Sequence, residues 1–183
     1  MKVFFDVARK RFGKFTTKQV EGFDAILEAT AFLPTSWRAY ILATAWHETA
    51  ATMQPIREYG LGRGKRYGVP GRNKGQIPYG RGYVQLTWDD NYEAMDKALG
   101  LGGVLINNYD KALQPDIAAD ILVHGMVNGL FDGKRRGLGH FLPDETGSLE
   151  QFRQARRTVN IMDKADLIAG YAMTFQQGLK DNG

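Results

Sequence analysis

The chain contains no cysteine. This absence excludes disulfide bonds, thiolate nucleophiles and cysteine-based zinc sites. The chain also has no apolar run near the ~20 residues that a bilayer-spanning helix requires. Its first fifteen residues, MKVFFDVARKRFGKF, lack the long apolar region and small-residue cleavage site of a signal peptide. We therefore expect a protein made in a reducing compartment, with no export signal and no stable membrane insertion.

The length and composition are those of an ordinary folded domain. The 183 residues are 43% hydrophobic and 11% aromatic, so we expect a real core and a single domain over residues 1–183. The 24 basic and 20 acidic residues give a net charge of +4. This charge favours an anionic partner without naming one, and nucleic acid, a membrane surface and an acidic cell-wall polymer all stay open.

Helical spacing and capping signals predict a mostly helical chain. The sequence TTKQ at 16–19 has the form of a capping box and starts a helix to about Ala31. Thr35 or Ser36 then caps a central helix. Thr87 is expected to cap a helix to about Leu99. Further helices are expected from Pro115 and over residues 149–159 and 164–179, and a short strand over 83–86.

Two glycine-rich basic segments interrupt the helices. Residues 60–82 hold eight glycines, two prolines, six lysines or arginines and no acid, which excludes a helix or a long strand. The segment contains no phosphate-binding GxxxxGK[ST] motif. Loops of this length are usually functional or mobile, so a solvated loop and a basic lid over a groove are both open. Residues 129–139 form a second basic loop.

Two carboxylates carry the main chemical signal. Trp37, Ile41, Thr44 and Glu48 follow one stripe of a helix that is apolar on most of its surface. A carboxyl group there loses water, which raises its pKa toward the value that a general acid needs. Pro55 ends that helix near residues 52–53, so the chain can turn and bring Glu58 back. An inverting glycosidase needs two carboxyl groups roughly 6.5–9.5 Å apart.

The same residues also fit roles without catalysis. A glutamate at a helix end is more often solvated or paired with a base. His47 and Glu48 begin an HExxH zinc motif, but Ala51 stands where its second histidine belongs, so we expect no metal and no cofactor. The serine-hydrolase motif GxSxG is absent. The basic loop offers only Tyr67 and Tyr79 as stacking platforms, so we expect no nucleic-acid partner.

Several short motifs together resemble the family 19 chitinase-like glycoside hydrolases. They are HET at 47–49, YGRG at 79–82, QLTW at 85–88 and NY at 91–92. The segments ARRTVN at 155–160, MDKA at 162–165 and IAGY at 168–171 are similar to the closing part of phage endolysins in that group. The resemblance covers roughly residues 16–180. It implies a mainly α, lysozyme-like fold with at most a small strand region and a substrate groove.

The resemblance also implies roles for single residues. Glu48 would be the catalytic acid, Glu58 the base that activates water, and Thr87 a residue that holds this water. A second set would contact the sugar: Gln85, Asn91, Asn160, Tyr79 and Tyr83. The two tyrosines of this set would line the groove. From the residues alone, Thr87 serves equally well as a helix cap, Asn160 as a turn residue, and Gln85 as a strand residue.

The sequence favours peptidoglycan over chitin as the substrate, because the chain lacks disulfides, an export signal and an appended binding module. We expect a monomeric endolysin that hydrolyses β-1,4 bonds between N-acetylated amino sugars. It would stay in the host cytoplasm until lysis and then reach the periplasm and cell wall. The alternatives are a chitinase acting on N-acetylglucosamine polymers and a non-catalytic phage protein that binds the wall.

Overall fold

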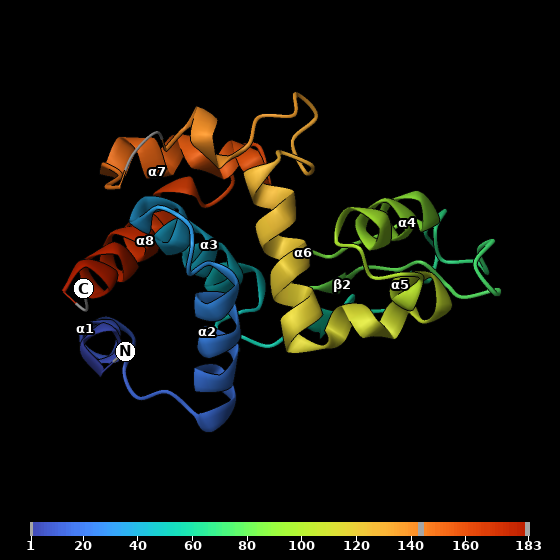
Figure 1. Ribbon diagram of the computed structural model, residues 1–183, viewed down its shortest axis with the longest axis horizontal. Helices are drawn as coiled ribbons and strands as arrows, with labels where there is room; N and C mark the ends of the chain where they lie inside the picture. Colours follow the sequence, from blue (N-terminus) through green and yellow to red (C-terminus); the bar gives the residue numbers. More distant parts are fainter. Residues whose placement is uncertain (1, 143–144, 182–183) are drawn as a thin grey trace. The chain divides into compact units, whose positions relative to one another are not determined.

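The computed structural model describes residues 2–142 and 145–181 (Figure 1). This part of the chain forms eight α-helices and one two-stranded sheet. The fold is therefore mainly α with a small strand region, as predicted from the sequence. Residue contacts divide the chain into two compact units, which are described in turn: residues 1–53 with 123–183, and residues 54–122. No helix within 2–142 and 145–181 is both long and apolar enough to cross a bilayer.

The first unit is built around the C-terminal helix. Helix α8 (Ala165–Lys180) packs against α1 (Lys2–Phe12), α3 (Thr35–Glu48) and α7 (Leu149–Ala155), and α2 (Thr17–Ala29) packs against α3. An aromatic core holds these helices together. Its central ring, Phe23, lies 5.8 Å from the rings of Phe4 and Trp46 and 5.6 Å from that of Phe175. Burial of rings of this size is the largest apolar contribution available to a domain of this length.

Two helices of this unit begin for different reasons, one because of a local capping signal and the other because of burial. The capping box before α2 is confirmed, because Thr16 and Gln19 exchange side-chain and backbone hydrogen bonds. Helix α1 was not predicted. It has no capping signal in the sequence, and its formation depends on burying Phe4, Phe5 and Ala8 against the rest of the unit.

Helix α3 is buried on most of its surface, as predicted, but its ends differ from the prediction. Its N-cap is Pro34, which makes no side-chain cap, rather than Thr35 or Ser36. Its last residue is Glu48 rather than residue 52 or 53. The chain leaves the helix directly after Thr49, because Ala50 and Ala51 take positive φ values of 49° and 67°. The Thr49 hydroxyl donates to the Ala45 carbonyl at 2.7 Å and accepts from the Met53 amide at 3.0 Å.

The end of the first unit follows the predicted order. Helix α7 continues into a 3-10 turn, η3 (Arg156–Thr158), before α8 begins at Ala165. Asn160 lies in the junction between them, as predicted. The second basic loop contains one short 3-10 turn, η2 (Leu138–His140).

The second unit contains the sheet. Strand β1 (Ile56–Arg57) pairs antiparallel with β2 (Arg81–Gly82). The predicted strand over 83–86 is wrong. The chain instead turns back after Gly82, and Arg81 and Leu86 exchange two backbone hydrogen bonds of 3.1 and 2.9 Å. Gln85 takes a positive φ of 55° in this turn, which is incompatible with an extended strand.

Short helices complete the second unit. Helix α4 (Asp89–Ala98) packs against α5 (Val104–Asn107), which is followed by the 3-10 turn η1 (Tyr109–Leu113). Helix α6 (Pro115–Val127) starts at Pro115 as predicted, and residue 122 is its last in this unit. The predicted cap of α4 is wrong, because Trp88 rather than Thr87 precedes the first turn. Within 60–82 the only regular structure is β2, so the predicted absence of a helix or long strand is confirmed.

Candidate active site

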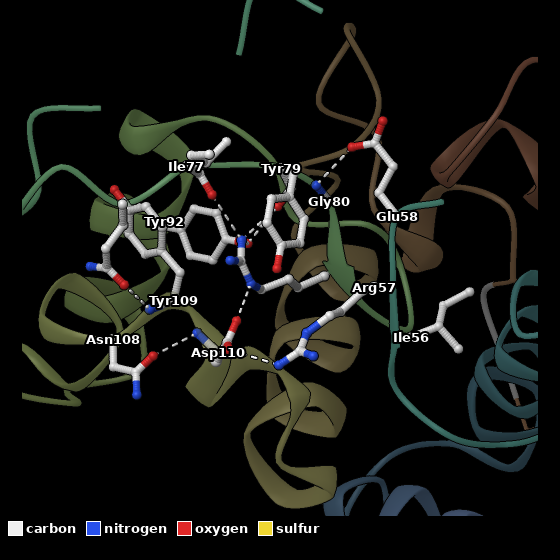
Figure 2. Close-up of polar contacts among 12 residues, drawn as sticks. Ile56, Arg57, Glu58, Ile77, Tyr79, Gly80, Tyr92, Asn108, Tyr109 and Asp110 are labelled. Atoms are coloured by element: carbon white, nitrogen blue, oxygen red, sulfur yellow. Dashed lines mark hydrogen bonds and ion pairs between the residues drawn. The ribbon is translucent and has the colours of Figure 1, made fainter. Parts of the chain in front are cut away.

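Three of the predicted site residues meet around Gly80 in the second unit. The Gly80 amide donates to Glu58 Oε2 at 3.1 Å, and its carbonyl accepts from the Glu58 amide at 2.8 Å (Figure 2). On its other side, a Cβ added to Gly80 would lie 2.7 Å from Gln85 Oε1 and 3.2 Å from Thr87 Oγ1. The absent side chain thus leaves room for Gln85 and Thr87 beside the residue that holds Glu58.

Glu58 is partly exposed and held as an acceptor. Besides the Gly80 amide, the hydroxyl of Tyr67 donates to its Oε1 at 2.8 Å. Hydrogen bonds to the charged form of a carboxylate stabilise that form, which is the state that a general base needs. The same hydrogen bond raises the pKa of Tyr67, so Tyr67 stays a donor at neutral pH.

Thr87 and Asn91 lie in one hydrogen-bonded chain with Gln85. The Thr87 hydroxyl donates to the Gln85 carbonyl at 2.7 Å, and the Asn91 amide donates to the Thr87 carbonyl at 2.7 Å. The Gln85 side chain donates to the Ile56 carbonyl at 3.3 Å. Both amides therefore keep their oxygens available to a ligand, and the Thr87 hydroxyl keeps its lone pairs.

An exposed aromatic pair adjoins these residues. The rings of Tyr67 and Trp88 meet edge to face, with 5.1 Å between their centres, and Trp88 is 45% exposed. Trp88 has φ 75° and ψ 139°, a backbone conformation that residues other than glycine rarely adopt. Its amide is held by the Pro78 carbonyl at 2.9 Å. A costly backbone conformation thus keeps an aromatic ring in solvent next to Tyr67.

The two tyrosines predicted to line the groove are covered by other parts of the second unit. Tyr83 is 1% exposed, and its burial raises the pKa of its hydroxyl. Tyr79 is 8% exposed, with the Arg81 guanidinium 3.6 Å from the centre of its ring. Both therefore have packing roles here, and their predicted contact with substrate stays a prediction.

Arg81 fixes the segment that carries Gly80. It is 5% exposed and donates to the Tyr79 carbonyl at 3.0 Å and to Asp110 at 2.7 Å. Arg57 donates to the other oxygen of Asp110 at 2.7 Å. Partial burial opposes the charge of Asp110, but the two guanidinium groups outweigh it and lower its pKa. This network, buried at Arg81 and partly exposed at Arg57 and Asp110, joins both strands and thereby sets the positions of Glu58 and Gly80.

Glu48 belongs to the first unit, where a buried arginine holds it. Arg156 is 2% exposed, and its Nη1 donates to Glu48 Oε1 at 2.7 Å. The Glu48 side chain is 26% exposed, less dry than the sequence argument required. Among the described residues only Oε1 is engaged, so Oε2 is the oxygen with which Glu48 would exchange a proton.

A polar stripe on α3 leads to Glu48. Tyr40 and Thr44 lie two turns and one turn before it, and both are fully buried. Their hydroxyl groups have no hydrogen-bond partner among the residues that the structure describes. Burial raises the pKa of Tyr40, and the charge of Arg156 opposes this rise. Tyr40 is therefore neutral throughout the range of pH in which Glu48 would act.

Asn160, the last predicted substrate contact, is exposed and lines a pocket in the first unit. Its side-chain oxygen accepts from the Ile161 amide at 2.7 Å, which is the turn role considered from the sequence. Its amide nitrogen is left to donate to a ligand.

Sequence reasoning missed the residues that hold both carboxylates. Arg156 lies 108 positions from Glu48, and nothing in local spacing joins them. The sequence indicates Tyr67 only as a stacking platform. For metals, no group of three histidine, aspartate or glutamate side chains within 2–142 and 145–181 is arranged to hold an ion.

Comparison with known proteins supports the fold independently. The sequence matches no protein-family model and no curated protein sequence. Among solved structures, it is similar to the crystal structure of chitinase C from Streptomyces griseus, with a TM-score of 0.57 and 21% sequence identity. The match covers 96% of this chain and 75% of that chain. The chitinase-like fold expected from the sequence motifs is therefore confirmed.

Proposed function

We propose that this protein is a glycoside hydrolase that cleaves β-1,4 bonds between N-acetylated amino sugars. The observation that carries the proposal is the arrangement of Glu58, Gln85 and Thr87 around Gly80. A carboxylate, a hydroxyl and an amide side by side can take a proton from water, orient that water and grip a sugar hydroxyl. The shared fold with a chitinase supports the same class of reaction.

In the proposed inverting reaction, Glu48 protonates the glycosidic oxygen through Oε2 while Arg156 holds Oε1. Glu58 takes a proton from the attacking water, whose other contact is the Thr87 hydroxyl. Gln85 and Asn91 accept from sugar hydroxyl groups through their side-chain oxygens, and Asn160 donates to a sugar oxygen through its amide nitrogen. The protonated Glu48 ends the reaction as a carboxylate paired with Arg156, so the buried guanidinium stabilises the product state of the acid.

Peptidoglycan is the proposed substrate, and a phage-type endolysin released at host lysis is the proposed role. The net charge of +4 suits an anionic wall, and the absence of cysteine suits synthesis in the reducing host cytoplasm. We expect the enzyme to act as a monomer. A chitinase, with the fold of chitinase C, is the second candidate.

One pair of assays separates these functions. The protein is added to purified peptidoglycan and, separately, to chitin oligomers, and the released products are identified by mass spectrometry. An endolysin releases disaccharide peptides from the first and acts at least about tenfold more slowly on the second, whereas a chitinase shows the reverse order. A wall-binding protein without catalysis sediments with peptidoglycan and releases no reducing ends.

The Glu58→Gln variant tests the mechanism in the same assay. It keeps an acceptor oxygen for Tyr67 but cannot take a proton. We expect the rate to fall at least about 100-fold, the usual range for an acid–base group. A loss below about threefold would remove Glu58 from the role of base.

A further inference from the structure

A pocket of about 500 Å³ in the first unit is not explained by cleavage of the sugar chain. It lies between the second basic loop, at Phe131 to Arg136, and the segment from Arg157 to Ile161. Its volume is within the range of about 300–1,000 Å³ that is typical of ligand sites. Asn160 lines it, so this pocket and the proposed sugar contacts share a residue.

The charges on the pocket wall do not cancel. Arg136 is neutralised within the wall, because its Nε donates to Asp132 at 2.8 Å. The hydrogen bond from Arg136 lowers the pKa of Asp132 to about 2, so this aspartate stays ionised. Lys134 and Arg157 line the same pocket, and neither pairs with a carboxylate of the described residues. The Arg157 Nε donates to the neutral side chain of Gln154 at 3.1 Å. The positive charges of Lys134 and Arg157 are therefore not neutralised within the wall.

Apolar side chains stand beside these two charges. Phe131 and Val159 line the pocket, together with Ile161, which is 78% exposed. A bare inorganic anion would leave this apolar surface in water. A short peptide with carboxylate groups and aliphatic side chains would satisfy the cations and cover the apolar wall at the same time.

The pocket is tied to the proposed acid by a short, hydrogen-bonded segment. Arg156, which holds Glu48, immediately precedes Arg157, so their Cα atoms are about 3.8 Å apart. The Arg156 carbonyl accepts from the amides of Val159 at 3.1 Å and Asn160 at 2.9 Å. A ligand group bound by Arg157 or Asn160 is thus held within a few residues, along the chain, of Arg156, the side chain that holds the proposed acid.

We propose that this pocket binds the carboxylate-bearing stem peptide attached to peptidoglycan. Chitin carries no such substituent, so the pocket would select peptidoglycan over chitin. The inference rests on the proposed function, and it deepens that function by naming what distinguishes the substrate. Lys134 and Arg157 bind the carboxylates, Asn160 donates to a peptide or lactyl oxygen, and Phe131 and Ile161 cover the aliphatic parts.

The test measures binding without turnover. The full-length protein is titrated calorimetrically with the free stem tetrapeptide, which contains no glycosidic bond, and with the same peptide after amidation of its carboxylates. Saturable binding of the free peptide is expected, and amidation should weaken it at least about tenfold. The Lys134→Gln/Arg157→Gln double variant should weaken it to a similar degree. The Lys18→Gln/Arg153→Gln variant, which removes the same charge outside the pocket, should bind like the wild type.

Each other outcome decides the question. Equal binding by the wild type and the pocket variant, or no effect of amidation, would overturn the proposal. Inorganic phosphate that binds as tightly as the peptide and displaces it would show a simple anion site and also overturn it. Because the peptide is not a substrate, peptide binding without hydrolysis of any glycan would refute the proposed function and leave this pocket assignment standing.

Discussion

The hydroxyl of Tyr67 lies 2.8 Å from Glu58 Oε1 and donates a hydrogen bond to it. Tyr67 belongs to the basic glycine-rich segment, whereas Glu58 follows strand β1 directly. The loop that the sequence marked as a possible lid therefore supplies a direct partner to the proposed base. Tyr67 also contacts the Trp88 ring, so one side chain joins the carboxylate to the exposed aromatic surface.

The first prediction concerns the ionisation of Tyr67. Its pKa is raised chiefly by the hydrogen bond to Glu58, with burial and the charge of Glu58 acting in the same direction. In the Glu58→Gln variant the negative charge is absent, so Tyr67 should lose its proton at a lower pH than in the wild type. The measurement is an NMR titration of ring-labelled tyrosine. Tyr83, whose pKa is raised by burial, is the internal control and should not move.

The Tyr67→Phe variant tests whether this hydrogen bond matters for catalysis. Phenylalanine keeps the ring contact with Trp88 and removes only the donor. A hydrogen bond to a charged group at a partly exposed site contributes on the order of 1 kcal/mol, so kcat should fall about fivefold. KM should stay within about twofold. A fall in affinity with an unchanged kcat would instead place Tyr67 among the substrate contacts.

The second prediction separates two roles of Glu48. Glu48→Gln keeps an acceptor for Arg156 but cannot deliver a proton, so the fold should persist and lysis should stop. Glu48→Ala leaves the guanidinium of Arg156 buried and without its anion. Breaking a buried pair costs on the order of 3 kcal/mol, so this variant should also unfold at lower urea concentration. Activity of Glu48→Gln above about a tenth of the wild type would refute the assignment of the acid.

Much of the scaffold could be predicted because it depends on local signals. The capping box at Thr16 and the helix start at Pro115 are each determined within a few residues of sequence. The same holds for the buried stripe of α3. The end of α3 differs from the prediction, because Pro55 is the stop signal that the sequence offers, whereas the positive φ values of Ala50 and Ala51 end the helix earlier.

What escaped prediction depends on contacts between distant positions. Arg156 and Glu48 meet across 108 residues, and Arg81 reaches Asp110 across 29. Such partners leave no periodic trace in one sequence. Trp88 escaped for a different reason. Its positive φ is sterically unfavourable, so a propensity argument places an ordinary cap at Thr87 instead.

The third prediction uses the space above Gly80. In Gly80→Ala the new methyl group would lie 2.7 Å from Gln85 Oε1 and 3.2 Å from Thr87 Oγ1. Both side chains must move, so the water and sugar contacts proposed for them should be displaced. We expect kcat/KM to fall at least about tenfold, with a loss of stability of about 1–3 kcal/mol from the added volume.

The Gly100→Ala variant is the matched control for Gly80→Ala. Gly100 has φ +64° and no heavy atom within 4 Å of an added Cβ, so the cost there is backbone strain of about 1 kcal/mol. Unfolding in urea and turnover of peptidoglycan are measured for both variants. Similar turnover by the two proteins would mean that the space above Gly80 serves packing alone.

The fourth prediction concerns the strain at Trp88. A residue held at φ 75° and ψ 139° costs about 1–3 kcal/mol, and glycine does not bear this cost. Trp88→Gly should therefore be more stable than Trp88→Ala by about 1 kcal/mol, as measured by urea unfolding. Both variants lose the exposed indole ring. If the strain is maintained because this ring contacts the glycan, both should show the same rise in KM, about tenfold, despite their different stabilities. A KM that follows stability instead would assign Trp88 to the fold, and the strained backbone would then have no connection with substrate.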